Sequence, residues 1–279
     1  MKCENKIAIL MATYNGAMYI REQMDSLLRQ TFTDWHLYIH DDGSTDETAD
    51  IIAGYVQANP DKITVLTYPS QGGACHNFFS LLEAVEAPYY MFCDQDDVWL
   101  TEKIEKSFAR MTQTERNHPG KAILVHSDLL LTDARLNVTS SSFLSNQRIR
   151  TDVIKTFEDY AATNTVTGCT TLFNQQAKAC IKRPYKKAIM HDAWLCLSVV
   201  ADNGIIELVN EPLVRYRQHA GNALGSTDMS RQTTLHKLLN IKRIVTADIR
   251  HYREMNAIKP ISLWSFIKAK WHYRKNYYL

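Results

Sequence analysis

Residues 88–99 read Pro-Tyr-Tyr-Met-Phe-Cys-Asp-Gln-Asp-Asp-Val-Trp, an apolar run that passes directly into a cluster of acidic side chains. The run from Tyr89 to Cys93 indicates a β-strand buried in a sheet. Asp94, Asp96 and Asp97 then follow directly after that strand. In open α/β sheets, ligands bind beyond the carboxyl ends of the strands. This stretch therefore predicts both a fold class and the position of a site.

The same succession of an apolar strand and a polar end occurs twice earlier in the chain. The run from Ile7 to Ala12 leads into Thr13-Tyr14-Asn15, and the run from Trp35 to His40 leads into Asp41-Asp42-Gly43. Three separate strand ends would therefore bring polar groups to one rim of the sheet.

Helical segments separate these strands. Apolar residues recur at helical spacing from Tyr19 to Gln30, after Asp46, and from Asn77 to Ala87, while Ile63 to Tyr68 indicates a further strand. Strands that alternate with helices predict an α/β fold, with a mostly parallel sheet and helices on both of its faces.

The second half of the chain is less regular. We expect a strand at Ala122 to His126, a helix from His191-Asp192 to Ala201, and a strand or hairpin at Ile205 to Tyr216. Residues 137–150 predict a loop, 165–174 a β-branched stretch around Gly168, and 221–230 a mobile segment. Helical periodicity and many basic and aromatic residues follow from Arg231 onward. We therefore divide the chain into an α/β domain, residues 1–226, and a C-terminal helical tail, residues 227–279.

The composition is that of an ordinary globular protein. Of the 279 residues, 45% are hydrophobic and 22% are charged, and the formal net charge of +2 is too small to indicate a nucleic-acid-binding protein. We find no signal-peptide pattern and no apolar run near the roughly 20 residues that span a bilayer. These observations predict a cytoplasmic protein. Its six cysteines form no Cys-x-x-Cys pair, so we expect buried free thiols.

The acidic clusters indicate the chemistry. Asp94 and Asp96 concentrate negative charge at the end of a buried strand, which a cation would neutralise, and oxygen ligands suit Mg²⁺ or Mn²⁺. The alternative is a solvated acidic turn. In the earlier cluster a helix cap explains Asp46, whereas the adjacent Asp41 and Asp42 suit a nucleoside pocket.

Several segments, taken in order, resemble the signatures of family 2 glycosyltransferases of the GT-A fold, the Rossmann-like fold of nucleotide-diphospho-sugar transferases. They are Ala12-Thr13-Tyr14-Asn15-Gly16, Asp41-Asp42-Gly43-Ser44-Thr45-Asp46, Asp94-Gln95-Asp96-Asp97-Val98-Trp99, Thr167-Gly168-Cys169, His191-Asp192-Ala193-Trp194 and Tyr216-Arg217-Gln218-His219. The resemblance extends over residues 5–222 and implies that residues 1–226 form a GT-A catalytic domain.

On the donor side, the resemblance implies that Thr13 and Tyr14 contact the nucleotide base, with Tyr14 stacked on it. Asp42 would accept a hydrogen bond from a pyrimidine N3–H, and Asn15 and Gln95 would belong to the same donor-binding set.

For the metal, the resemblance implies that Asp96 is the main ligand and that Asp94 holds the metal or the ribose. His219 would lie near the diphosphate and join the metal ligands. Mg²⁺ or Mn²⁺ would then act as a Lewis acid on the diphosphate leaving group.

On the acceptor side, the resemblance implies that Asp192 is the general base that deprotonates the acceptor hydroxyl. In this family the attack inverts the configuration of the anomeric carbon. Gly168, His191 and Trp194 would shape the acceptor and sugar pocket.

Each of these residues also has a structural interpretation. Tyr14 could be a surface tyrosine, Trp194 an ordinary core residue and His219 a solvated loop residue. Asp192 could serve only as the cap of its helix, and Gln95 could cap the helix that follows.

Together these inferences predict an inverting glycosyltransferase of bacterial cell-surface polysaccharide synthesis. Its donor would be a nucleotide-sugar, dTDP-rhamnose or a UDP-hexose, and its acceptor a saccharide or lipid-linked saccharide. Two other classes stay open. Asp94-x-Asp96-x-Val98 also resembles the nucleophile motif of haloacid-dehalogenase-like phosphohydrolases, although that motif normally follows the first strand of its fold. The second open class is a non-catalytic module that binds a nucleotide-sugar.

The C-terminal tail interleaves basic residues with Trp264, Phe266, Trp271 and Tyr273. Such a pattern on helices suits peripheral association with an anionic membrane, here the inner face of the plasma membrane, and would fit a lipid-linked acceptor. The alternative is a tail that packs on the catalytic domain and leaves its lysines in solvent.

Overall fold

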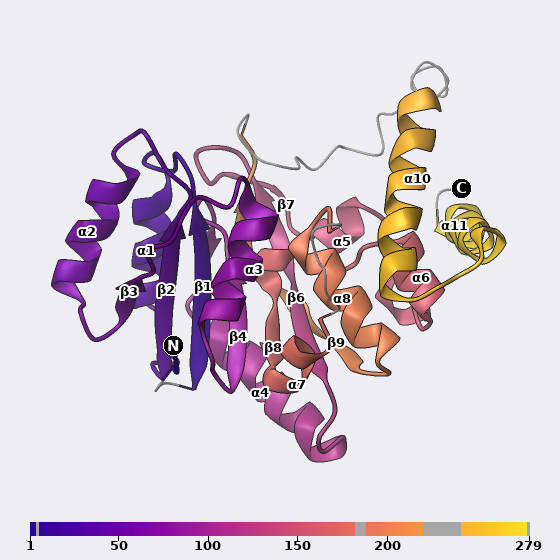
Figure 1. Ribbon diagram of the computed structural model, residues 1–279, viewed down its shortest axis with the longest axis horizontal. Coiled ribbons are helices and arrows are strands. Elements are labelled where there is room, and N and C mark those ends of the chain that lie inside the picture. The colour runs from indigo at the N-terminus through magenta and orange to yellow at the C-terminus, as the bar shows by residue number, and fades with distance from the viewer. Residues whose placement is uncertain (4–5, 182–187, 220–240, 278–279) are drawn as a thin grey trace.

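The computed structural model describes residues 1–3, 6–181, 188–219 and 241–277 (Figure 1). The strands are β1 (Ile7–Thr13), β2 (Trp35–Asp41), β3 (Ile63–Val65), β4 (Tyr89–Cys93), β5 (Val98–Trp99), β6 (Ile123–Thr132), β7 (Val138–Ser140), β8 (Leu172–Asn174) and β9 (Ile205–Arg217). The helices are α1 (Ile20–Leu28), α2 (Thr48–Ala58), α3 (Ala74–Ala84), α4 (Lys103–Asn117), α5 (Phe143–Asn146), α6 (Phe157–Ala162), α7 (Gln175–Ala179), α8 (His191–Ala201), α10 (Ile241–Ile258) and α11 (Leu263–Tyr277). The described residues also contain two 3-10 turns, η1 (Thr151–Val153) and η2 (Gly168–Thr170).

Within the described residues the strands form one sheet, in the order β3-β2-β1-β4-β8-β6-β9-β5, with β7 paired to β6. The strands β3, β2, β1 and β4 are parallel, whereas β8 is antiparallel to both β4 and β6. The sheet is therefore mixed in its second half. Thr13 pairs with Asp41, and Met11 with Cys93. This register brings the carboxyl ends of β1, β2 and β4 to one edge, as predicted.

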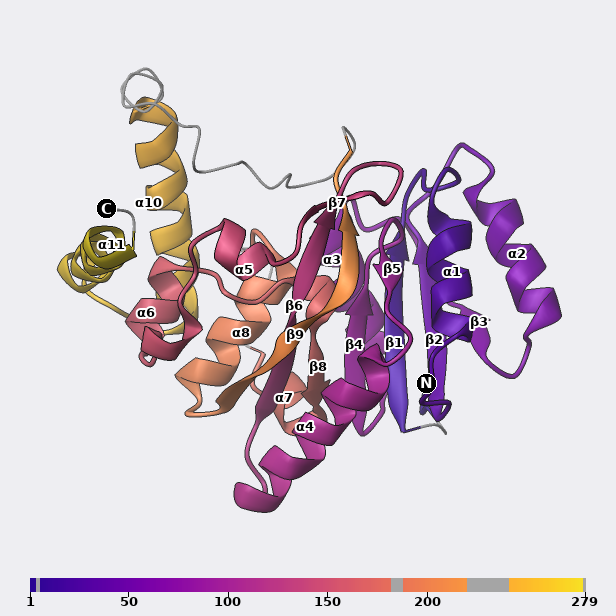
Figure 2. The ribbon, with the colours of Figure 1, turned by 180° about the vertical axis from the view of Figure 1, so that it is seen from behind.

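Helices cover both faces of the sheet because successive strand residues point to opposite sides. Ala8 and Leu10 of β1 belong to a core cluster shared with α3, α8, α10 and α11. Ile7, Ile9 and Met11 belong to a second cluster shared with α1, α2 and α4. Figure 1 shows α3 and α8 in front of the sheet, and Figure 2 shows α1 and α4 on the opposite face.

Several predicted boundaries and types need correction. Strand β3 ends at Val65, and α3 occupies Ala74–Ala84 rather than 77–87. Residues 137–150 contain β7 and α5 instead of an irregular loop. A carboxylate oxygen of the buried Asp128 stabilises the start of α5, because it accepts hydrogen bonds from the first backbone N–H groups of that helix. Of the two forms expected for residues 205–216, a strand or a hairpin, the strand is confirmed as β9. Pro212, which cannot donate to a ladder, lies where the β6–β9 register shifts.

The C-terminal helices predicted from the tail are present, and they pack on the sheet domain. Helix α10 contacts α8, and α11 contacts α6. Met255, Ile258, Ile261 and Phe266 are buried in the same core cluster as Trp194. The predicted mobile segment 221–230 and the boundary after residue 226 lie outside the described residues. None of the described helices is long and apolar enough to cross a bilayer.

Candidate active site

A cleft of about 830 Å³ lies at the carboxyl ends of β1, β2 and β4 and is closed on one side by the start of α8. Nine of the residues predicted to form the site line it. These are Thr13, Tyr14, Asp42, Asp94, Gln95, Asp96, Gly168, His191 and Asp192. Residues far apart in the sequence thus share one cavity, because the parallel strands end at the same edge.

Asp42 holds the turn that forms one wall of the cleft. Its carboxylate accepts hydrogen bonds from Ser70 Oγ at 2.8 Å, Gln71 N at 2.5 Å and Gly73 N at 2.8 Å. Burial opposes ionisation of Asp42, but these hydrogen bonds outweigh it and lower the pKa of the carboxyl. A carboxylate has about four acceptor positions, so Asp42 can still accept one further hydrogen bond from a ligand.

The neighbouring Asp41 has a local structural task. It accepts hydrogen bonds from Thr13 Oγ1 at 2.8 Å and from Ser44 N at 2.8 Å. Asp46 is not the N-cap of the next helix that the sequence predicted, because that position is held by Glu47. The Oδ1 of Asp46 accepts from Thr48 N at 3.1 Å, and its Oδ2 accepts from Ala17 N. Of the three acids in this segment, only Asp42 lines the cleft.

The loop after β1 is fixed by side chains from two other loops. Gln95 accepts from Tyr14 N at 3.0 Å and donates to Tyr14 O at 2.9 Å. A Cβ atom on Gly16 would lie 2.2 Å from Gln95 Oε1, so a side chain there would displace this amide from Tyr14. Asn15 has a positive φ of 47° and its Oδ1 accepts from Thr45 N. The Tyr14 ring itself is 56% exposed at the rim, where it can stack on a planar ligand.

Negative charge is concentrated where β4 ends. Burial raises the pKa of Asp94 to about 8, with further contributions from the charges of Asp96 and Asp192. Burial, followed by the charges of Asp96 and Asp94, raises the pKa of Asp97 well above its usual range. The Oδ2 atom of Asp97 also has no hydrogen-bond partner among the described residues. Such an array of carboxyls fits a divalent cation, which would offset the crowded charge.

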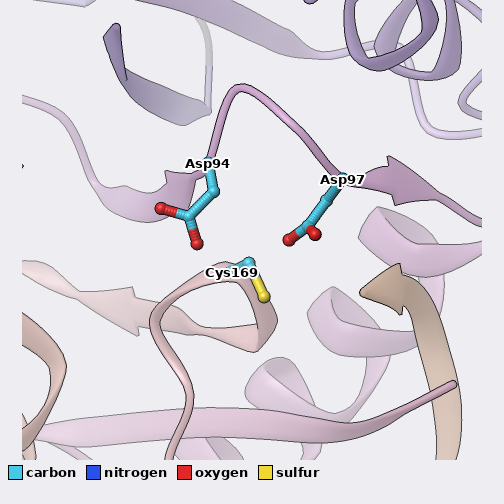
Figure 3. A group of neighbouring side chains, drawn as sticks. All are labelled: Asp94, Asp97 and Cys169. Atoms are coloured by element: carbon cyan, nitrogen blue, oxygen red, sulfur yellow. The ribbon is translucent and has the colours of Figure 1, made fainter. Parts of the chain in front are cut away.

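The ligand atoms of Asp94, Asp97 and Cys169 lie within 4.8 Å of one another. Figure 3 shows both carboxylates directed toward Cys169 from the two ends of one turn. Burial raises the pKa of the Cys169 thiol well above its usual range, so the sulfur stays protonated. A protonated thiol is a poor metal ligand, and Mg²⁺ and Mn²⁺ prefer oxygen. Because Asp94 and Asp96 line the cleft and Asp97 is fully buried, the first two could hold a cation.

His219 lies beside these acids. Its Nε2 is 2.8 Å from Asp96 Oδ2, and its ring centroid is 4.6 Å from that of Tyr19. The side chains of His219 and Asp96 are 15% and 17% exposed. An imidazole nitrogen and a carboxylate in this arrangement can share one cation as ligands.

Arg217 ties the acidic turn to the end of β9. Its Nε donates to Asp96 O at 2.8 Å, and its backbone N donates to Asp97 Oδ1 at 3.1 Å. The guanidinium also donates to Ala134 O at 2.7 Å and pairs with Glu22. Since Arg217 is only 2% exposed, it is a buried anchor rather than a surface charge. This task was not predicted, although Arg217 lies within the segment that identified His219.

Asp192 is the first acidic residue of α8. Its Oδ2 accepts from Gly168 N at 3.0 Å, and its Oδ1 accepts from Ala193 N at 2.6 Å. Burial raises the pKa of Asp192 to about 6, although these backbone hydrogen bonds act in the opposite direction. A carboxyl with such a pKa is ionised at neutral pH and basic enough to take a proton.

His191 adjoins this carboxylate and packs between Phe78 and Phe92, at centroid distances of 4.1 and 4.7 Å. Neither ring nitrogen has a hydrogen-bond partner among the described residues, and burial lowers the pKa of His191 to about 3. A Cβ on Gly168 would lie 2.6 Å from His191 Nε2, so a side chain there would displace the His191 ring. Both nitrogens are buried, so the neutral ring contributes a wall of the cleft.

Trp194 lies elsewhere. It is 1% exposed in the core cluster under α8, and it is absent from the described lining of the cleft, as is Asn15. Asn15 supports the loop that presents Tyr14, and Trp194 supports α8.

The chain resembles known glycosyltransferases in sequence. The family model described as glycosyl transferase family 2 matches residues 8–179. The dTDP-rhamnosyl transferase RfbG of Shigella flexneri is 26% identical over 227 residues, which cover 77% of this chain and 74% of that protein. The UDP-Glc:alpha-D-GlcNAc-diphosphoundecaprenol beta-1,3-glucosyltransferase WfgD of Escherichia coli is 23% identical over 202 residues, 71% of each chain.

Solved structures show the same fold. TarS of S. aureus, in complex with UDP-GlcNAc, superposes with a TM-score of 0.60 at 18% identity, over 97% of this chain and 74% of that chain. The mannosyltransferase PcManGT from Pyrobaculum calidifontis, in complex with GDP-Man and Mn²⁺, gives a TM-score of 0.55 at 14% identity, over 95% and 73%. The GT-A fold is confirmed, and the phosphohydrolase interpretation is set aside. The family model covers more than half of the chain, which therefore belongs to glycosyltransferase family 2.

Proposed function

We propose that this chain is an inverting glycosyltransferase that moves a sugar from a pyrimidine nucleotide-sugar to a hydroxyl of a saccharide or lipid-linked saccharide. The observation that carries the proposal is the position of Asp192. Its buried carboxylate lines the same cleft as Asp94 and Asp96, so a base and a diphosphate-binding region face one cavity.

The nucleotide would occupy the side of the cleft formed by the β1 and β2 ends. The exposed ring of Tyr14 would stack on the base, and Thr13 would lie beside it. Asp42 would use its remaining acceptor position for the N3–H of uracil or thymine. This N–H is common to dTDP-rhamnose and to UDP-hexoses, which are the donors that the names of RfbG and WfgD indicate.

Asp94, Asp96 and His219 would hold Mg²⁺ or Mn²⁺ against the diphosphate. A bound cation would supply Lewis-acid stabilisation of the leaving group. The Mn²⁺ in the structure of PcManGT supports this assignment. Arg217, through Asp96 O and the backbone contact to Asp97, keeps the acidic turn in place while the diphosphate is bound.

The transfer itself is a single displacement. The acceptor oxygen attacks the anomeric carbon, the bond from that carbon to the diphosphate oxygen breaks, and the nucleoside diphosphate leaves with the electron pair. Asp192 takes the proton of the acceptor hydroxyl. One displacement with the acceptor and the leaving group on opposite faces inverts the anomeric centre. His191 and Gly168 would form the sugar pocket beside this base.

The membrane is the proposed location of the acceptor. On α11, Leu263, Trp264, Ile267 and Trp271 are 52%, 73%, 47% and 61% exposed, and Lys268 lies among them. Exposed tryptophan with lysine on a helix suits the interface of an anionic bilayer. We propose that the enzyme acts at the inner face of the plasma membrane on a lipid-linked saccharide of a cell-surface polysaccharide.

A thermal-shift titration tests the donor and metal assignments. UDP and dTDP with Mn²⁺ should raise the melting temperature more than GDP or ADP does, since a ligand that binds the folded state stabilises it. In Asp96→Asn, the part of the shift that depends on Mn²⁺ should disappear while the smaller shift caused by uridine stays. Full sugar transfer by the wild type in excess chelator would refute the metal assignment, and an equal response to all four diphosphates would refute the base assignment.

A further inference from the structure

The first turn of α8, which carries Asp192, is reached by a side chain from the C-terminal helix α10. Glu254 of α10 is only 3% exposed, and its Oε1 accepts a hydrogen bond from Ile189 N at 2.7 Å. Ile189 precedes Asp192 by three residues and leads into the helix through Met190, which provides no side-chain cap. The contact with Glu254 therefore supports the helix entry where a cap is lacking.

The buried carboxylate of Glu254 has a second partner. Its Oε2 lies 3.3 Å from Nδ1 of His251, whose Nε2 lies 2.8 Å from Ala161 O. Both ring nitrogens of His251 thus face acceptors, so the ring lies fixed between Glu254 and the backbone of α6. The pair stays in place because Met255 is fully buried in the core and anchors the helix.

We propose that Glu254 is a positioning residue of the transfer reaction, which holds Ile189 and Met190 so that Asp192 faces the acceptor hydroxyl. The inference rests on the proposed function of Asp192 as the base. Met190 and His191, the two residues between Ile189 and Asp192, also line the cleft. A shift of this segment would therefore move the base and the pocket wall together.

The opposite side of the base is fixed by Gly168, whose N–H donates to Asp192 Oδ2. Among the described residues, another side-chain contact to the segment before the helix comes from Cys75, whose sulfur is a loose 3.9 Å from Ala188 O. Catalytic groups tolerate little displacement, and a misplacement of about 1 Å can lower a rate on the order of a hundredfold. Loss of the Glu254 contact should therefore lower turnover more than donor binding.

Two substitutions of Glu254 separate the effect of its side-chain length from the effect of its charge. Glu254→Gln keeps an oxygen that can accept from Ile189 N but removes the charge, whereas Glu254→Asp keeps the charge but is one methylene too short. Arg253→Ala changes the exposed neighbour on the same helix and serves as the control. Transfer is measured from dTDP-rhamnose and UDP-glucose to GlcNAc diphosphate carried on a short alkyl chain, and donor affinity by thermal shift.

We expect Glu254→Asp to lower kcat by roughly ten- to a hundredfold, with donor affinity unchanged. Glu254→Gln should stay within about threefold of the wild type, and Arg253→Ala should match it. Equal losses in the Gln and Asp variants, or an unaffected kcat in Glu254→Asp, would overturn the proposal.

Asp192→Asn is measured alongside as a reference. If it keeps turnover, the base assignment itself fails, whatever the Glu254 variants do. If it loses turnover while Glu254→Asp does not, only the positioning inference fails. Should Glu254→Asp not fold, His251→Ala, which removes the ring that lies against Glu254 Oε2, should fold and lower kcat; a His251→Ala kcat equal to the wild type would then overturn the proposal.

Discussion

Asp42, Asp96 and Asp192 are carboxylates of one cleft whose surroundings prepare them for different tasks. Backbone N–H groups surround Asp42 and keep it ionised and directed. Asp96 faces an imidazole and a partly open cavity, which suits cation binding. Asp192 is buried with few donors, and its raised pKa makes it a better base than an exposed aspartate. The environment of each side chain, more than its type, decides what it can do.

The base assignment predicts a large effect from a small change. Asp192→Asn keeps the shape of the side chain and its acceptor toward Gly168 N, and Asn also suits a helix start. We expect the fold and donor affinity to be retained and transfer to fall roughly a hundredfold or more, since the proton acceptor is gone. Steady-state rates of the folded variant measure this, and turnover at the wild-type rate would leave Asp192 as a structural residue only.

The same residue sets a pH dependence. Because the carboxyl must be ionised to accept a proton and its pKa is raised to about 6, the rate should rise as pH increases through about 6 and then level off. A pKa near the ordinary value of about 3.9 would leave the rate flat over that range. Rates between pH 4.5 and 8 with saturating Mn²⁺ test this. The residual activity of Asp192→Asn should lack the acidic limb; its persistence would assign that limb to another group.

We expect substitution of Arg217 to lower the stability of the fold and to weaken the proposed metal site. Arg217→Lys keeps a charge but cannot make the forked contacts to Asp96 O, Ala134 O and Glu22. Because buried charged hydrogen bonds are lost, we expect a loss of about 2 to 4 kcal/mol in unfolding free energy and weaker Mn²⁺-dependent nucleotide binding. Urea unfolding measures the first. Arg215→Lys, two residues earlier on the same strand, is the control, and equal losses in both variants would contradict the anchoring role.

Helix α11 has two faces with different surroundings. Phe266 is 2% exposed and packs near Tyr252 of α10 at a ring distance of 5.7 Å, whereas Trp264 and Ile267 face outward. One face of the helix thus belongs to the core and the other is open to a partner. The alternatives of packing and membrane binding, left open by the composition of the tail, therefore apply to opposite faces of one helix.

From the exposed face of α11 we expect membrane association that point variants on this face can remove. Trp264→Ser with Ile267→Ser should reduce co-sedimentation with phosphatidylglycerol vesicles about tenfold or more, since aromatic and aliphatic groups insert at the bilayer interface. Nucleotide binding should not change, because these residues lie outside the cleft. Ile249→Ser, which replaces a similarly exposed residue on α10, controls for loss of apolar surface. Vesicle binding equal to that of the wild type in the double variant would remove α11 as the anchor.

The C-terminal helices and the sheet domain share one hydrophobic core. A single cluster contains Leu10 of β1, Phe92 of β4, Trp194 of α8 and Phe266 of α11. The division after residue 226 stays a prediction about the chain, yet the helices beyond it share apolar contacts with the sheet. We therefore expect the tail and the sheet domain to unfold together.

Removal of one buried ring tests this coupling. Phe266→Ala should lower the unfolding free energy by about 3 to 5 kcal/mol, because the ring is fully buried and a cavity is left. The loss should appear as a shift of one cooperative transition, seen alike by far-UV dichroism and by the release of bound dTDP. Trp264→Ala, on the exposed face of the same helix, should have little effect. Two separate transitions in Phe266→Ala would show that the tail unfolds independently.

The local sequence determined the strands and the site rim. The apolar runs at residues 7–12, 35–40 and 89–93 have few polar groups and form β1, β2 and β4, and their polar ends meet because parallel strands share an edge. The order of the family motifs pointed to Asp42, Asp96 and Asp192, which the structure places in one cleft. These features depend on residues close together in the chain, so they were predictable from it.

Only the tertiary structure decided how the site is supported. Arg217 meets Glu22 across 195 positions of sequence, and Glu254 reaches Ile189 from a segment whose composition indicated a basic surface. A lone acid among lysines and arginines carries no local signal of burial, and whether Trp194 faces the cleft or the core depends on which side of α8 meets the sheet. Such contacts form between side chains whose separation in sequence is large, and packing of whole elements, not local propensity, brings them together.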